Sequence, residues 1–192
     1  QGGVISPILA NIYLHEVLDS WFEKRVQPRL RGRAFMVRYA DDAVLVFSDR
    51  KEAERVLKAL EERCLSYGLH LHPEKTRLVP FRRPPRDPGD SGPGSGKRPG
   101  TFDFLGFTHF WAKSRRGKWH VRRKTARDRM RRAIKAVNWW CASHRHWRVK
   151  VQHLYLSKVI VGHCRYYGIT GNSIQIGRFR QEVQRAWRVW LN

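Results

Sequence analysis

The first apolar pattern in the chain has the period of an α-helix and follows a serine–proline pair. Ser6 and Pro7 are expected to cap and begin this helix, because a hydroxyl can accept a backbone N–H and proline suits the first turn. The pattern therefore predicts an amphipathic helix from residue 7 to about residue 25. Its apolar face is formed by Ile8, Leu9, Ile12, Val17, Leu18, Trp21 and Phe22.

Two short runs of β-branched and aromatic residues come next, at residues 35–39 and 43–47. Asp41 and Asp42 stand between the cores of these runs. Strand-forming runs that flank a polar pair predict a β-hairpin, so the two carboxylates are expected at its tip.

A second helix and a short strand are expected after this hairpin. Gly68 is placed to end the helix, since glycine adopts the left-handed conformation that closes many helices. Residues 69–72 then alternate between apolar and polar, as in a strand. The helix covers residues 49–66, and its apolar face contains Ala53, Val56, Leu57, Leu60 and Cys64.

Residues 82–100 interrupt the pattern with five prolines and five glycines, a composition that indicates a flexible surface insertion. Residues 102–107 and 119–121 then have the pattern of strands around a turn at 114–117. The remainder predicts three helices. Their apolar stripes are Met130, Ile134, Val137 and Cys141 in the first, Leu156, Val159, Ile160, Cys164 and Tyr167 in the second, and Ile176, Phe179, Val183, Trp187 and Trp190 in the third.

Positive charge is concentrated in the second half of this 192-residue chain, whose formal net charge is +23. Residues 1–110 hold 18 Lys and Arg against 14 Asp and Glu, whereas residues 111–192 hold 21 against 2. So basic a segment repels itself unless a polyanion neutralises it, which makes nucleic acid the expected partner and an anionic membrane surface the weaker alternative. The sequence has no run of 18 apolar residues and no signal-peptide pattern, which predicts a soluble intracellular protein without a membrane partner.

The adjacent carboxylates of Asp41 and Asp42 need an explanation beyond turn formation. Aspartate is common in turns, so a simple polar turn is one reading. However, neighbouring carboxylates repel each other, and a simple hairpin turn would favour Asn-Gly or Asp-Gly. A divalent cation removes the repulsion, and Mg²⁺ prefers one or two carboxylates together with substrate phosphates.

Several segments resemble one family, in that family's order. Tyr39-Ala40-Asp41-Asp42 resembles the Tyr-x-Asp-Asp signature of reverse transcriptases. Residues 1–7 with Ala10-Asn11 resemble the block before it, residues 68–76 the block after the catalytic hairpin, and residues 104–107 the primer-side block. Residues 162–172 resemble the thumb, or maturase-specific, signature of bacterial group II intron proteins. The chain is thus similar to group II intron-encoded reverse transcriptase/maturases, and its Gln-Gly-Gly start is interpreted as an N-terminal truncation.

This resemblance implies the fold and the activity. An α/β palm fragment would cover residues 1–110, including the insertion at 82–100, and an all-helical basic thumb would cover residues 111–192. The implied activity is RNA-templated DNA synthesis from deoxynucleoside triphosphates, with Mg²⁺ as cofactor. Intron RNA and an RNA/DNA template–primer are the implied partners, and the bacterial cytoplasm, within a ribonucleoprotein, is the implied location.

The resemblance also implies roles for residues near the hairpin. Asp41 would be the main metal ligand and Asp42 a weaker companion. Lys75 would approach the triphosphate and could protonate the departing pyrophosphate, although it could equally be a solvated lysine beside Glu74. The nucleotide pocket would be lined by Gln1, Gly2, Tyr39 and Ala40, of which Tyr39 could instead be an ordinary strand aromatic.

A second group of residues would contact the nucleic acid. Phe104, Leu105 and Gly106 are expected both to pack in the core and to support the primer. Arg129 and Arg132 are expected to contact RNA phosphates, which are recognised through charge rather than through base edges.

One departure from the family concerns catalysis. A further palm aspartate that the family uses to hold its metals is not found in this chain, so the fragment alone is expected to be inactive while the full-length protein polymerises. The rival hypothesis is a splicing maturase that only binds and folds intron RNA. The Asp41–Asp42 pair favours catalysis, because a protein that only binds RNA gains nothing from clustered negative charge.

Overall fold

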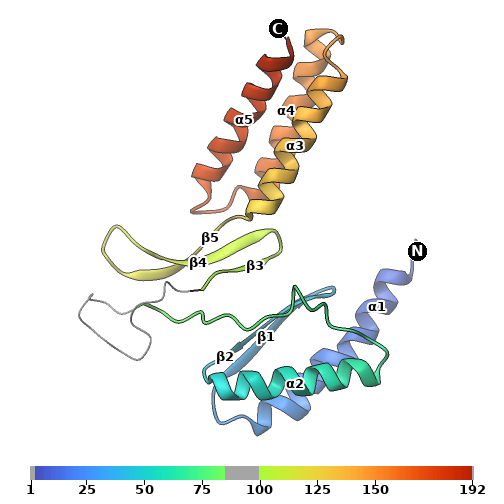
Figure 1. Ribbon diagram of the computed structural model, residues 1–192, viewed down its shortest axis with the longest axis vertical. Helices are drawn as coiled ribbons and strands as arrows, with labels where there is room; N and C mark the ends of the chain where they lie inside the picture. Colours follow the sequence, from blue (N-terminus) through green and yellow to red (C-terminus); the bar gives the residue numbers. More distant parts are fainter. Residues whose placement is uncertain (1–2, 85–99, 192) are drawn as a thin grey trace. The chain divides into compact units, whose positions relative to one another are not determined.

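The computed structural model describes residues 3–84 and 100–191 (Figure 1). The chain divides into two compact units, Gln1–Val79 and Pro80–Asn192. This division differs from the expected one after residue 110, which would cut strand β4 (Phe107–Lys113). Because β4 pairs along its whole length with β5 (Trp119–Thr125), the strands after the insertion belong with the C-terminal helices. Most of the expected insertion, residues 85–99, lies outside the described residues.

The first unit begins with the expected long helical segment, but its geometry changes along its length. Helix α1 (Ser6–Leu14) is followed by two π-helical turns, His15–Ser20 and Phe22–Val26, and by a 3₁₀ turn at Gln27–Arg29. Only the later part of this segment contributes to the core. Val17, Phe22 and Val26 are buried, whereas Ile8, Leu9 and Ile12 are exposed.

The predicted capping role of Ser6 is wrong. Ile5 precedes the helix with helical backbone angles, and no side chain caps the first turn of α1. Ser6 therefore already lies within the helix, where its backbone N–H donates to the carbonyl of Gly3. Pro7 occupies the first turn, as expected from its fixed φ.

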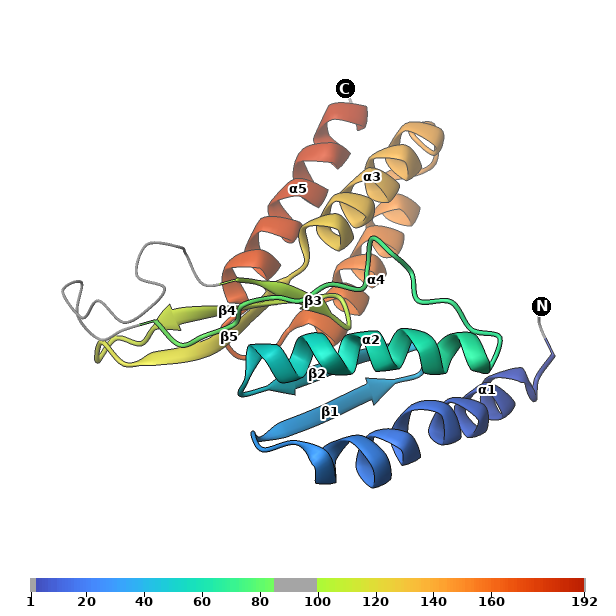
Figure 2. The same cartoon turned by 60° about the horizontal axis from the view of Figure 1, so that its bottom comes forward.

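The β-hairpin is confirmed, with strands β1 (Ala34–Tyr39) and β2 (Asp42–Phe47) in an antiparallel register that pairs Tyr39 with Asp42. Figure 2 shows helix α2 (Arg50–Ser66) running alongside this hairpin. One face of the hairpin packs against the helical segments. That core contains Phe22, Val26, Ala34 and Val56, with Trp21, Leu30, Met36, Leu45 and Phe47 packed around it.

Both ends of α2 are fixed by local signals. The Asp49 carboxylate accepts the backbone N–H of Glu52 at 2.9 Å and caps the first turn. Gly68, at φ +69°, closes the helix with paired hydrogen bonds, from Leu69 N–H to Cys64 and from Gly68 N–H to Leu65.

The strand predicted at residues 69–72 is wrong. In the described part of the chain this segment pairs with no other strand. Alternation of apolar and polar residues only suits a segment for a sheet, and a strand forms only when neighbouring backbone groups pair with it.

The second unit starts with a three-stranded antiparallel sheet in the order β3–β4–β5. The single strand expected over residues 102–107 is instead divided into β3 (Phe102–Phe104) and the start of β4. Leu105 and Gly106 form a two-residue turn between them, both with positive φ, at +50° and +77°. Turns with two positive φ values match the twist of antiparallel strands, which explains why the chain reverses here.

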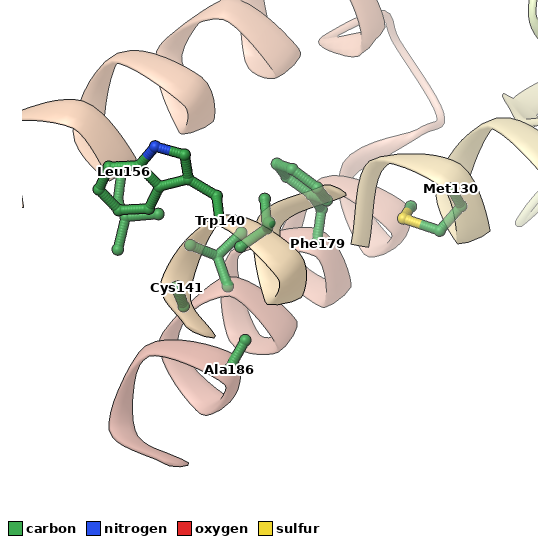
Figure 3. Close-up of a cluster of buried hydrophobic side chains, with 8 residues drawn as sticks. Met130, Trp140, Cys141, Leu156, Phe179 and Ala186 are labelled. Carbon is green, nitrogen blue, oxygen red and sulfur yellow. The ribbon is translucent and has the colours of Figure 1, made fainter. Parts of the chain in front are cut away.

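The three predicted C-terminal helices are confirmed as α3 (Arg127–Ser143), α4 (Val149–Tyr167) and α5 (Ser173–Leu191). Their apolar stripes meet in one core, part of which is drawn in Figure 3. None of the described helices is long and apolar enough to cross a membrane. The core residues are Met130, Val137, Trp140, Cys141, Leu156, Phe179, Val183 and Ala186.

Candidate active site and nucleic-acid interface

The tip of the β1–β2 hairpin is a two-residue loop, Ala40–Asp41, between the paired residues Tyr39 and Asp42. Ala40 has φ +53°, a left-handed conformation that residues other than glycine rarely adopt. This conformation costs about 1–2 kcal/mol, so surrounding contacts must hold it in place.

Tyr39 and Asp42 lie on the face of the hairpin that the helices leave exposed. Strand residues alternate between faces, so Tyr39 shares its face with Phe35 and Val37 of β1. These three side chains are 57–66% exposed, and Val46, paired with Phe35, is 52% exposed. An open apolar and aromatic surface thus leads to the carboxylate of Asp42.

The two carboxylates are available to a ligand. Asp41 and Asp42 are exposed, and neither forms a hydrogen bond or ion pair with another side chain of the described residues. Uncompensated adjacent carboxylates fit the oxygen-ligand chemistry of Mg²⁺. They are only two ligands, however, and no cluster of three or more His, Cys, Asp or Glu suited to a metal occurs in residues 3–84 and 100–191.

Arg38 lies beneath the loop, on the helix-covered face of the hairpin. Its Nε and Nη2 donate to the two carboxylate oxygens of Asp19 at 2.8 and 2.6 Å. Its Nη1 donates to Oδ1 of Asn11 at 3.0 Å and to the carbonyl oxygen of Ala40 at 2.8 Å. The hydrogen bonds from Arg38 lower the pKa of Asp19, against the opposing effect of burial. The same pairing raises the pKa of Arg38.

Sequence reasoning missed this network, although one signal was present. In β1, residue 38 falls on the face that carries Ala34 and Met36 toward the core. An arginine among core-facing positions requires a partner, because a charge is costly to bury alone. The partners, Asn11 and Asp19, could not be chosen from the sequence, since they are 27 and 19 residues away.

Lys75, Gln1 and Gly2 are the other residues predicted for the active site. Lys75 is exposed in a turn in which its backbone N–H donates to the carbonyl of His72. Within the described residues, no hydrogen bond or ion pair joins the Lys75 side chain to Asp41 or Asp42. Gln1 and Gly2 lie outside the described residues.

In the second unit, the turn at Leu105–Gly106 packs against the end of helix α4. The hydroxyl of Tyr166 donates to the carbonyl of Leu105 at 3.0 Å, and the Tyr166 ring stacks on Phe107 with 5.9 Å between centroids. A Cβ on Gly106 would lie 3.0 Å from the hydroxyl of Tyr167. The close approach and the positive φ both require glycine at this position.

Asn172 fixes the loop after α4 to the end of β5. It is 1% exposed, and its side-chain NH₂ donates to Oγ1 of Thr125 at 2.9 Å and to the carbonyl of Tyr167 at 2.8 Å. Its Oδ1 accepts the backbone N–H of Thr125 at 3.0 Å. This buried residue was also missed, because its partner Thr125 lies 47 positions away.

Arg129 and Arg132 lie in the first turns of α3, near the same tyrosines. Burial raises the pKa of Tyr167, and the charges of Arg129 and Arg132 act on it in the opposite direction. The two side chains are 52% and 63% exposed, and both pair with Asp128, at 3.9 and 2.5 Å. Tyr167, which lies against Gly106, is therefore near both arginines. Of the residues predicted to contact the primer and RNA, Phe104, Leu105 and Gly106 are half-buried, and Arg129 and Arg132 are exposed. We call Leu105, Gly106, Arg129, Arg132 and Tyr166 the turn–helix surface.

Comparison with protein families gives a match to the first part of the chain. The protein family described as "Reverse transcriptase (RNA-dependent DNA polymerase)" matches residues 1–109. These residues include the β1–β2 hairpin and the Leu105–Gly106 turn. No curated protein matches the chain.

Proposed function

The chain belongs to the reverse transcriptase family, and from this premise we propose that its protein synthesises DNA on an RNA template, with Asp41 and Asp42 in the catalytic centre. The observation that carries the proposal is the pair of exposed, unpaired carboxylates at the tip of a hairpin whose open face is apolar and aromatic. A protein that only binds RNA has no use for this negative charge.

Asp41 and Asp42 would hold Mg²⁺ together with the phosphates of the substrate. The bound metal would activate the primer 3′-hydroxyl and neutralise the charge that develops on the leaving pyrophosphate. Asp41, in the loop, would be the principal ligand, and Asp42, at the first position of β2, its companion. The remaining ligands would have to come from outside the described residues or from the substrate, since these residues supply no third carboxylate to the site.

Two side chains would act on the nucleotide. Tyr39 is 66% exposed on the face of Asp42, where its ring can support a base or sugar by stacking. Lys75 is exposed and carries a mobile ammonium, so it could reach a triphosphate and donate a proton to the departing pyrophosphate. Ala40 and the first residues, Gln1 and Gly2, would complete the nucleotide pocket.

The second unit would bind the template–primer and structured RNA. Residues 80–192 hold 26 Lys and Arg against 5 Asp and Glu, while residues 1–79 hold 13 against 11. The turn–helix surface adds an exposed tyrosine and two arginines beside a tightly packed turn. Together with the resemblance of residues 162–172 to the maturase signature, these features support a group II intron protein that binds its intron RNA and assists splicing.

The substitution Asp41→Asn tests the catalytic part of the proposal, because it keeps the shape of the side chain and removes the charge that holds the metal. Primer extension by the full-length protein should fall by more than about 100-fold. Even residues that only orient metal ligands contribute roughly 10–100-fold to metal affinity or activity, and Asp41 would bind the metal directly. Filter binding of the same preparation to RNA should remain within about twofold, because the charge of the second unit is unchanged.

Two results would change this assignment. Equal loss of synthesis and RNA binding would show that Asp41 supports the fold. Full RNA binding and splicing by a wild-type protein that never extends a primer would favour the rival function, a maturase without polymerase activity.

A further inference from the structure

Arg38 connects the loop that carries Asp41 to the helical segment behind the hairpin. Four of the five guanidinium N–H groups are used, two on Asp19, one on Asn11 and one on the carbonyl of Ala40. The Arg38 side chain is 12% exposed and that of Asp19 21% exposed, so solvent screens this contact only partly. Hydrogen bonds to three different residues therefore fix the orientation of the guanidinium.

The carbonyl of Ala40 belongs to the peptide group that leads into Asp41. Fixing its oxygen fixes the plane of that peptide, and with it the direction in which the Asp41 side chain leaves the backbone. Ala40 has φ +53°, which alanine adopts only where other contacts impose it. The hydrogen bond from Arg38 to this carbonyl, at 2.8 Å, is such a contact.

The charge of Arg38 would work against a metal if it were free. An unpaired guanidinium beneath two carboxylates would attract them and compete with a cation. Here both oxygens of Asp19 accept hydrogen bonds from Arg38, which neutralises it on the side away from the loop. Asp41 and Asp42 form no ion pair with it or with other described residues.

We propose that Arg38 is a positioning residue for the metal site: it orients the loop through the carbonyl of Ala40, while Asp19 neutralises its charge and Asn11 fixes its place. This inference rests on the proposed function, because it assumes that Asp41 and Asp42 hold a divalent cation. It adds a set of three residues behind the hairpin that adjusts how well the carboxylates bind that cation.

Arg63 provides a matched control in the same unit. It also donates to backbone carbonyls, those of Val17 at 2.7 Å and Glu16 at 3.1 Å, but makes no contact with the hairpin loop. Arg38→Lys and Arg63→Lys each keep one positive charge and lose the planar fork that bonds several acceptors together. Both substitutions should reduce stability, and only the first should affect the metal.

The experiment measures Mn²⁺ binding to the 192-residue chain by the loss of the free-ion signal in electron paramagnetic resonance, with thermal unfolding recorded for each variant. Asp41→Asn gives the background from other acidic residues. Arg38→Lys should weaken Mn²⁺ binding above this background by about 10-fold or more, the lower end of the effect of residues that orient metal ligands. Arg63→Lys should leave it within about twofold.

Asn11→Ala guards against a variant that fails to fold. Asn11 is exposed on α1, so its loss buries no unpaired charge, and it should weaken Mn²⁺ binding in the same direction as Arg38→Lys but less. Unchanged Mn²⁺ affinity in both Asn11→Ala and a folded Arg38→Lys would overturn the positioning role and leave the proposed function intact. Wild-type binding no stronger than that of Asp41→Asn would overturn the metal site itself, and the positioning role with it.

Discussion

His163 shows how a single half-buried side chain can make the stability of the second unit depend on pH. Its ring stacks on Phe179 with 3.7 Å between centroids, and its Nε2 has no hydrogen-bond partner in the described part of the chain. Burial lowers the pKa of His163, because the charged form would lose hydration without gaining a partner. Folding therefore favours the neutral form of this imidazole.

We predict that the second unit (residues 80–192) becomes less stable as the pH falls below about 6.5, the ordinary pKa of histidine. Below this value the unfolded chain binds a proton that the folded chain still excludes, so the free energy of unfolding falls with falling pH, by at most about 1.4 kcal/mol per pH unit for one histidine. His163→Leu, which cannot be protonated, should reduce this slope. Urea unfolding between pH 5 and 8 measures it.

His146→Gln, at an exposed position of the same unit, serves as the control for replacing a histidine. His109, whose pKa is also lowered by burial, should account for part of the slope that remains in His163→Leu. An identical slope in the wild type and in His163→Leu would show that the pKa of His163 is the same in the folded and unfolded states.

At the scale of elements, two turns with glycine at positive φ differ in what surrounds the glycine. Gly106, between β3 and β4, lies against the hydroxyl of Tyr167. Gly117, at φ +72° between β4 and β5, is open, because a Cβ added to it would have no atom within 4 Å. The second turn is held by local bonds, such as that from Gly117 N–H to the carbonyl of Ser114 at 3.0 Å. Only the first turn connects the sheet to helix α4.

We predict that Gly117→Ala lowers the free energy of unfolding by about 1–2 kcal/mol, the cost of a left-handed residue with a Cβ. Gly106→Ala should cost this amount and more, because its methyl group would displace Tyr167. Tyr167→Phe, which removes the hydroxyl, should relieve part of the extra cost in the double variant, as a double-mutant cycle by urea unfolding would show. Equal costs for the two glycines would mean that Tyr167 yields without penalty.

Gly106→Ala should also weaken binding of template–primer, and Gly117→Ala should not, if the turn–helix surface contacts nucleic acid. A gel-shift titration of both variants at one salt concentration compares them directly. Equal affinities of the two variants would show that the turn at Gly106 does not contribute to binding of the template–primer.

At the scale of the whole molecule, positive charge is distributed unevenly between the two units. Nearly all of the positive excess belongs to residues 80–192, with 26 basic against 5 acidic residues, while the unit with the paired carboxylates is close to neutral. This distribution would attract nucleic acid to the second unit, whereas the first unit carries little net charge of its own.

We predict that the chain binds structured RNA with a strong dependence on salt. If six to ten of its basic side chains contact phosphates, affinity should fall by roughly 10³–10⁵ between about 50 and 200 mM salt, on the calibration for duplex DNA. Replacing Arg129 and Arg132 by Ala should weaken binding to all RNAs and reduce the slope of log affinity against log salt by about one per lost contact.

The matched control replaces Lys51 and Lys58, two exposed lysines of α2 in the near-neutral unit. This double variant removes the same charge and should change the slope by less than the arginine variant. Equal effects would mean that net charge alone drives binding, and an affinity for anionic lipid vesicles equal to that for RNA would favour a membrane surface as the partner.

The sequence by itself determined the elements whose signals are local. The strand-forming runs on either side of Asp41 and Asp42 predicted the hairpin, Gly68 marked the end of α2, and the apolar stripes marked the three C-terminal helices. Each signal is a period or a terminal residue within a few turns of chain, and backbone geometry converts it directly into a helix, a strand or a cap. Asp41 and Asp42, the residues proposed to be catalytic, were visible for the same reason.

Tertiary structure alone decided which residues surround those elements. Arg38 meets Asn11 and Asp19, Asn172 meets Thr125, and β4 joins the helical unit because β5 pairs with it. The failed strand at residues 69–72 has the same origin, since a pattern cannot supply a partner for the backbone. Periodicity specifies on which face of a helix or strand a residue lies. What that face contacts depends on segments tens of residues away, which are brought together when the shared apolar core is buried.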